Sequence, residues 1–189
     1  TGPYRVAQFE SNKAIVVVPN EKFTPSPHRS AARAKRLDAV FIPDQDVQIA
    51  QAITAGGSLP TVEAHKTIAG AITSGSDDLS VSTWGALSGN VTGVEDVTSF
   101  AYDSISGNVT SLTGHASAMS WDTISSMING PTGVSVGAWQ NMAATIITGA
   151  NAIVSSYHDV TGGINAAEQV LVSAAGNVNS TITSSNADV

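Results

Sequence analysis

The chain of 189 residues contains no cysteine, so neither a disulfide framework nor a thiolate metal site can form. No stretch of about 18 consecutive apolar residues exists, and the sequence therefore predicts no transmembrane helix. Aromatic residues are also scarce, at 5% of the chain. A disulfide-stapled scaffold and a helical membrane protein are thus both disfavoured by composition alone.

Basic residues are missing from most of the chain. All eight Lys and Arg residues lie within the first 66 positions, whereas the segment after Lys66 holds nine of the 15 acidic residues. This segment cannot bind nucleic acid by neutralising phosphates, and it offers trypsin-like proteases no cleavage site. An acidic surface rich in hydroxyl and amide groups suits a part that is exposed outside a cell or particle.

An apolar stripe runs from Leu87 to Ile182 with a mean spacing close to the 3.6 residues of an α-helical turn. It predicts two long helices with a break at 129–133, so the expected fold class is mainly α: an elongated helical hairpin in an oligomeric bundle, with a small β or extended N-terminal anchor. The stripe is narrower than a lone helix needs, which predicts a coiled-coil homotrimer. The expected oligomer seam comprises Val91, Val94, Val97, Ile105, Val109, Leu112, Met119, Ile146, Ile153, Val160, Ile164, Leu171 and Val178.

An internal repeat allows a second interpretation. The segment 87–92, Leu-Ser-Gly-Asn-Val-Thr, recurs as Ile-Ser-Gly-Asn-Val-Thr at 105–110. Its offset equals five helical turns, but Val, Ile, Thr and Gly at this period also suit the stacked coils of a β-solenoid shaft. Ser, Thr, Asn and Gly are moreover poor residues for a helix interior. Apolar steps of three and four, rather than two, favour the helical interpretation.

The chain divides by composition into three regions. Residues 1–58 are expected to form the N-terminal docking anchor, 59–78 a short helix and hinge, and 79–189 the acidic helical shaft. Short strands are predicted over 4–9 and 14–18. The residues expected to dock onto a partner protein are Arg29, Arg33, Lys35, Arg36, Val16, Val18 and Phe41. A solvated helical turn and nucleic-acid binding are the alternatives for the basic cluster, although no aromatic residues are interleaved with its charges.

No motif for catalysis, cofactor binding or metal binding is present. The four histidines are not spaced as ligand pairs, and no Gly-x-Ser-x-Gly or phosphate-binding loop occurs. We therefore expect no enzyme, no cofactor and no metal. Trp84, Trp121 and Trp139 are expected to plug the ends and the central turn of the bundle, with carbohydrate stacking as the alternative.

Runs such as Gly-Asn-Val-Thr-Ser-Leu-Thr-Gly at 107–114 resemble shaft segments of tailed-bacteriophage fibres and related capsid decoration proteins. The resemblance implies a structural protein of the virion, namely a capsid fibre, decoration or connector protein. Its partners would be its own copies and a capsid or tail protein bound through residues 1–60, without nucleic acid or membrane. The alternative is an adhesin-like binding module that is secreted or displayed on a cell surface.

Overall fold

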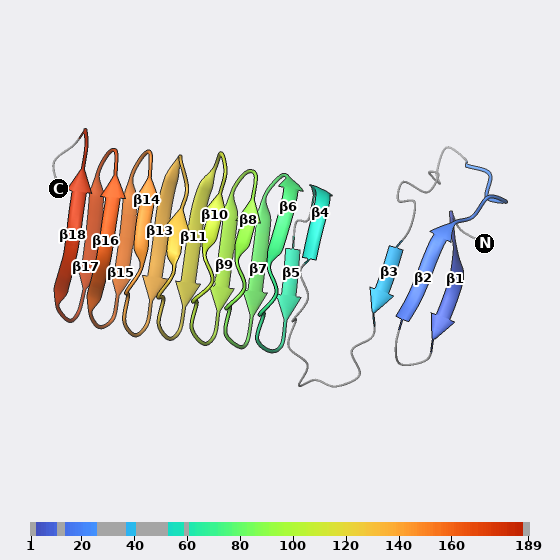
Figure 1. Cartoon of the computed structure of the whole chain (residues 1–189), viewed down its shortest axis with the longest axis horizontal. Helices are drawn as coiled ribbons and strands as arrows, with labels where there is room; N and C mark the ends of the chain where they lie inside the picture. The colour runs from blue at the N-terminus through green and yellow to red at the C-terminus, as the bar shows by residue number, and fades with distance from the viewer. Residues whose placement is uncertain (1–2, 11–13, 26–36, 41–52, 59–60, 187–189) are drawn as a thin grey trace. The chain divides into compact units, whose positions relative to one another are not determined.

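The computed structural model describes residues 3–10, 14–25, 37–40, 53–58 and 61–186 (Figure 1). The chain forms two compact units, residues 1–47 and 48–189. Over the described residues both units consist of strands joined by turns, without any helix, and hence without a helix that could span a membrane. The mainly α fold class expected from the sequence is therefore wrong, and with it the coiled-coil bundle.

The N-terminal unit contains a small antiparallel sheet. Its three strands are β1 (Tyr4–Glu10), β2 (Ala14–Pro19) and β3 (Leu37–Val40), in the order β1-β2-β3. β1 and β2 lie where short strands were expected, because their β-branched and aromatic residues favour extended backbone. A register irregularity between Val6 and Gln8 interrupts their pairing.

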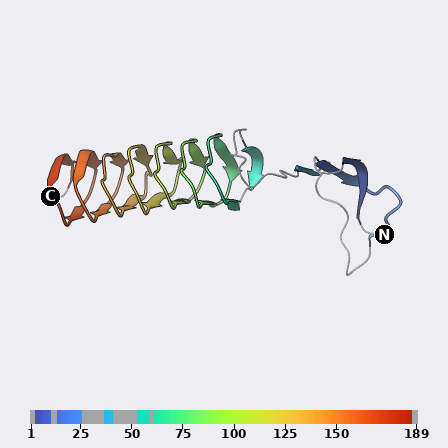
Figure 2. The ribbon, with the colours of Figure 1, turned by 90° about the horizontal axis from the view of Figure 1, so that it is seen from below.

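The second unit is a parallel β-solenoid, in which the chain winds back and forth between two sheets (Figures 1 and 2). We name these the even sheet and the odd sheet after their strand numbers. The even sheet contains β4 (Ile53–Ser58), β6 (Ile72–Ser76), β8 (Val91–Gly93), β10 (Val109–Ser111), β12 (Met127–Asn129), β14 (Thr145–Thr148), β16 (Val160–Ala166) and β18 (Val178–Ser184). The odd sheet contains β5 (Thr61–Ala64), β7 (Leu79–Thr83), β9 (Val97–Ala101), β11 (His115–Ser120), β13 (Gly133–Ala138), β15 (Ala152–Ser156) and β17 (Val170–Ala174). The β-solenoid that the sequence allowed as an alternative is thus the fold of this unit.

Each coil of the solenoid takes up 18 or 19 residues. The hydrogen-bonded pairs Val91↔Val109 and Val109↔Ile128 illustrate the two lengths. The extra residue of the longer coil lies where the chain passes from one sheet to the other: between the register pairs Gly93↔Ser111 and Val97↔Ala116, one coil has the residues 94–96 and the next has 112–115. Because the turn absorbs the difference, the strands stay in register and equivalent side chains stack from coil to coil.

The core lies between the two sheets and is built from one chain alone. Inward and outward side chains alternate along each strand, as in the burial of β9, where Val97, Ser99 and Ala101 are buried. Side chains at equivalent positions form columns, and we name the clearest the inner column. It comprises Ile68, Leu87, Ile105, Ile124, Met142 and Val160, all at most 1% exposed and joined by parallel bridges.

The solenoid divides the predicted oligomer seam between its core and its surface. Seven seam residues are buried inside the single chain: Val91, Val97, Ile105, Val109, Ile146, Val160 and Ile164. Val94 is half-buried, and the exposed ones are Leu112, Met119, Ile153, Leu171 and Val178. The residues therefore do not share one face. The step of 3.6 was an average over alternating strands and turns, since 18 residues make one coil here and would make five turns of a helix.

Two further local predictions are corrected by the same geometry. The expected break at 129–133 is an ordinary turn between β12 and β13, and the stack continues through it because β12 pairs with β14 and β13 with β15. Gly133, the first residue of β13, has a φ of 152°. Instead of the short helix expected within 59–78, the chain forms β5 and β6.

Candidate functional site

An aromatic residue follows the end of five successive strands of the odd sheet. Because these strands are parallel and in register, the residues stack outside the solenoid, one per coil. We name this stack the aromatic ladder, and it comprises Trp84, Tyr102, Trp121, Trp139 and Tyr157. The rings are between 47% and 63% exposed, so the ladder is a surface feature and not part of the core.

Neighbouring rings of the ladder contact each other through their faces. The four successive centroid distances are 5.4, 5.8, 5.1 and 4.5 Å, and the planes are inclined by 14° to 33°. Such offset stacking is the favoured geometry for aromatic pairs. The faces of the three middle rings are therefore occupied by their neighbours. Of the two end rings, Trp84 has His65 at the equivalent position of the preceding coil, and Tyr157 has no ring on its outer face over the described residues.

Backbone hydrogen bonds fix the turns that carry the rings. The N–H of Trp139 donates to the carbonyl of Ser120 at 3.0 Å, and the N–H of Tyr157 donates to the carbonyl of Ala138 at 3.1 Å. Under the turn after β11, the buried hydroxyl of Ser120 donates to the carbonyl of Asp103 at 2.5 Å and accepts from the N–H of Asp122 at 2.9 Å. The ladder thus stands on backbone whose polar groups are satisfied, which holds the rings in place.

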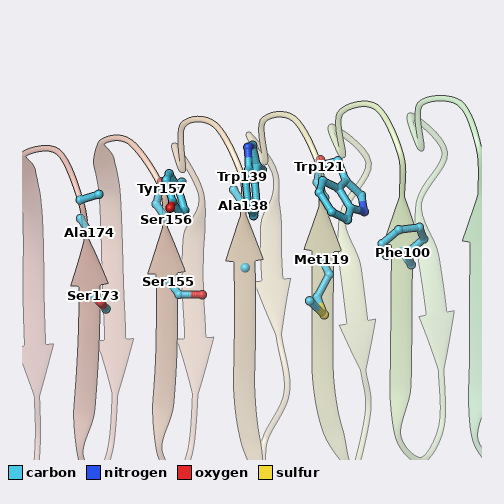
Figure 3. A pocket seen from close by; sticks show the side chains of 13 residues that line it. Phe100, Met119, Trp121, Ala138, Trp139, Ser155, Ser156, Tyr157, Ser173 and Ala174 are labelled. Carbon is cyan, nitrogen blue, oxygen red and sulfur yellow. The ribbon is translucent and has the colours of Figure 1, made fainter.

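A groove of about 590 Å³ runs beside the ladder on the outer face of the odd sheet (Figure 3). In Figure 3, Trp121, Trp139 and Tyr157 stand at the strand ends, while Met119 and Ser155 lie further back along their strands. The groove is mainly apolar and has the size of small-molecule sites in proteins. Another hollow, of about 410 Å³, lies at Trp84.

Side-chain oxygens brace the turns on the opposite edge of the odd sheet and along the even sheet. The Oδ1 of Asp96 accepts from the N–H of His115 at 2.7 Å, one coil further along. Asn90 Oδ1 likewise accepts from the N–H of Asn108 at 2.9 Å, and Asn108 Oδ1 accepts from the N–H of Met127 at 3.1 Å. These acidic and amide groups connect successive coils, so their recurrence has a structural cause and does not indicate an acid–base pair.

The structure describes only two of the predicted docking residues. Arg29, Arg33, Lys35, Arg36 and Phe41 lie outside the described residues. Val16 and Val18 both belong to β2, and Val18 is half-buried. Docking by this unit stays a prediction.

The described residues contain no cluster of three or more His, Cys, Asp or Glu side chains that could hold a metal ion. His115 contacts Ser135 through Nε2 at 3.1 Å, and its backbone N–H is held by Asp96. The arrangement lends itself to binding through apolar rims and hydroxyl groups, and the described side chains suggest no acid, base and nucleophile set around the groove.

The sequence showed the three tryptophans but missed the ladder. They do not plug a bundle, and Tyr102 and Tyr157 continue their row. The signal was present in the spacing of the five aromatics, which is 18 or 19 residues at every step and equals the coil length. Comparisons of the chain with family models, with curated proteins and with solved structures found no match.

Proposed function

We propose that this chain is a non-enzymatic structural component of a virion, such as a capsid fibre, decoration or connector protein. In this proposal the N-terminal residues 1–60 dock onto a capsid or tail protein, and the solenoid serves as a shaft. The observation that carries the proposal is the regularity of the solenoid: successive coils repeat the parallel backbone pairing, and six of them contribute a residue to the inner column. A periodic stack of this kind extends by adding coils, which suits a spacer better than a catalytic domain.

The absence of Lys and Arg after Lys66 supports an exposed location. The shaft offers no site to trypsin-like proteases, and its carboxylates are brought to turns where they bind backbone N–H groups. Both features favour persistence outside a cell. The expected homotrimer stays a prediction, but its original reason is gone, because seven residues of the supposed seam are buried inside a single chain and the exposed ones do not share a face with them.

The proposal is tested by co-sedimentation with particles of the source. Full-length chain should sediment with purified particles, and a variant that lacks residues 1–47, the first compact unit, should remain in the supernatant. Retained β-type circular dichroism and ladder fluorescence in the truncated variant would show that the solenoid is still folded. Sedimentation of the truncated variant with particles, or failure of the full-length chain to sediment, would refute docking through this unit.

The groove beside the ladder favours the alternative function, an adhesin-like binding module. A contiguous exposed apolar surface on a single chain is characteristic of an interaction site. The two functions separate in one experiment: an adhesin binds cells or glycans without its first 47 residues, whereas a docked shaft component needs them.

A further inference from the structure

We infer that the groove binds a neutral polysaccharide segment, with one sugar ring stacked on the free face of Tyr157 above Ala175. This site goes beyond the structural role proposed above and does not depend on it. The inference rests on where the ladder ends, on the side chains that form the groove, and on the charge of the surrounding surface.

The ladder ends where the stack of coils continues. The N–H of Ala175 donates to the carbonyl of Ser156 at 3.2 Å, as the N–H of Tyr157 does to Ala138 one coil earlier. Ala175 therefore occupies the ladder position of its coil but supplies only a methyl group. Tyr157 stacks on Trp139 at 4.5 Å and has no ring on its other side over the described residues. Its greater exposure, 60% against 47% for Trp139, reflects this open face.

The floor of the groove is made of small residues in the same three coils. The outward positions Met119, Gly137, Ser155 and Ser173 are register neighbours along the odd sheet. Met119 and its register neighbour Phe100 line one end of the groove, and from Gly137 onward no side chain on its floor is larger than serine. The three small positions Gly137, Ser155 and Ser173 are two strand spacings of about 4.8 Å apart, so this floor is roughly 10 Å long and accommodates a short segment of an extended chain.

The chemistry of the lining fits a sugar better than an apolar peptide. A pyranose ring has an apolar C–H face, which packs on an aromatic ring, and hydroxyl groups around its edge. The exposed hydroxyls of Ser155 and Ser173 stand on the floor within reach of such an edge. The largest side chains of the groove, Met119, Trp121, Trp139 and Tyr157, are 47% to 60% exposed, so the groove is open to solvent and lacks the buried anchor pocket that protein hot spots usually fill.

The charge of the surface around the groove determines which polysaccharides can bind. The segment after Lys66 has no Lys or Arg, and Asp103 and Asp122 directly follow two ladder residues. An anionic polymer would approach carboxylates without a cationic partner, which disfavours uronate-rich glycans and nucleic acids. A neutral glycan meets no such repulsion.

The test uses the full chain and the neutral probes cellohexaose, mannohexaose and xylohexaose, with hexagalacturonate as the charged control. Binding is followed by ladder fluorescence and by isothermal titration calorimetry. We expect at least one neutral probe to bind in the millimolar range or better, and hexagalacturonate to bind at least about tenfold more weakly. No binding by any neutral probe would overturn the inference.

Two substitutions place the site. Tyr157→Ala removes the stacking face, and Ala175→Trp fills the space over it while adding a sixth ring to the ladder. Both substitutions should weaken glycan binding at least about tenfold. Ala175→Trp should leave the melting temperature unchanged or raise it, so a loss of binding by this variant cannot be ascribed to unfolding. Trp84→Ala, at the opposite end of the ladder, is the matched control and should retain binding. Undiminished binding by Ala175→Trp would overturn the inference. Self-association of the chain that rises with concentration and that Ala175→Trp abolishes would also overturn it, because the occupant of the groove would then be a second copy of the chain.

Discussion

The inner column and the aromatic ladder are two stacks with one side chain per coil, and the first points into the core whereas the second lies on the surface. Inner-column residues are at most 1% exposed, whereas ladder residues are 47% to 63% exposed. Burying an Ile or Leu stabilises the fold by about 1.5–3 kcal/mol, and an aromatic pair adds about 0.5–1.5 kcal/mol beyond its buried area. Because the coils are in register, the side chains at any repeated position stack. The buried inner column contributes most to the stability of the fold, whereas the exposed ladder forms part of the surface.

The largest expected effect comes from one substitution made at a buried position of the even sheet and at an exposed position of the odd sheet. Ile146 is 1% exposed and Ile153 is 50% exposed, although both were assigned to one helical seam. Ile146→Ala should lower the free energy of unfolding by about 2–5 kcal/mol, because it leaves a cavity between stacked coils. Ile153→Ala should cost less than about 1 kcal/mol. Urea denaturation measures both, and equal costs would contradict the division into inside and outside stacks.

Close contact between coils gives the next prediction. A Cβ at Gly107 would lie 2.0 Å from the carbonyl oxygen of Gly89, whereas a Cβ at Gly163 would meet nothing within 4 Å. Gly107→Ala should destabilise by about 3 kcal/mol, since the obstacle is backbone that cannot rotate away. Gly163→Ala should be neutral or stabilise by about 0.4–1 kcal/mol, because it restricts only the unfolded chain.

Thermal melting of the two glycine variants provides the measurement. The same substitution, Gly to Ala, is made in both, so any difference reports the distance between neighbouring coils and not intrinsic propensity. Equal melting temperatures would show that the coils can separate locally to admit a methyl group, and the tight stacking described here would then be wrong.

The ladder itself gives a smaller effect. Trp139 stacks on two rings, at 5.1 and 4.5 Å, whereas Trp84 stacks on one, at 5.4 Å. Trp139→Ala should therefore cost about 1–3 kcal/mol and Trp84→Ala about 0.5–1.5 kcal/mol, because the first removes two stacking pairs and the second one. Denaturation gives the stabilities, and near-ultraviolet circular dichroism reports the ring coupling, which should fall further for Trp139→Ala. The opposite ranking would mean that the rings contribute individually and not as a stack.

Part of this fold could be read from the sequence. The repeat at 87–92 and 105–110 was visible and has the coil length, and the β-branched runs gave β1 and β2. The choice between helix and solenoid failed because an 18-residue offset fits both. Strands such as β8 and β10 have only three residues, so alternation of period two lasts for a single step before a turn breaks it.

The candidate site was predictable to a lesser degree. Once the coil length is known, the five aromatics fall on one row, and Ala175 falls next in that row. The sequence could not predict the orientation of the rings, because rings that stack on each other and rings that point apart into solvent would have the same spacing in the sequence. The groove likewise depends on which of two faces Ser155 and Ser173 occupy, and the strand register decides that.

The smallest predicted effect lies inside the core and has the opposite sign. Ser99 is 0% exposed, stacks between Val81 and Ala118, and its Oγ has no hydrogen-bond partner among the described residues. Ser99→Ala should raise the free energy of unfolding by about 1 kcal/mol, because an unpaired buried hydroxyl carries a desolvation cost without a compensating bond. Ser120→Ala is the matched control, and it should lower stability by about 1 kcal/mol, since that hydroxyl bonds to Asp103 and Asp122. Urea denaturation measures both variants and so compares two buried serines, of which only Ser120 has the polar groups of a turn within reach. Destabilisation by Ser99→Ala would mean that the Ser99 hydroxyl has a partner inside the stack, such as a buried water.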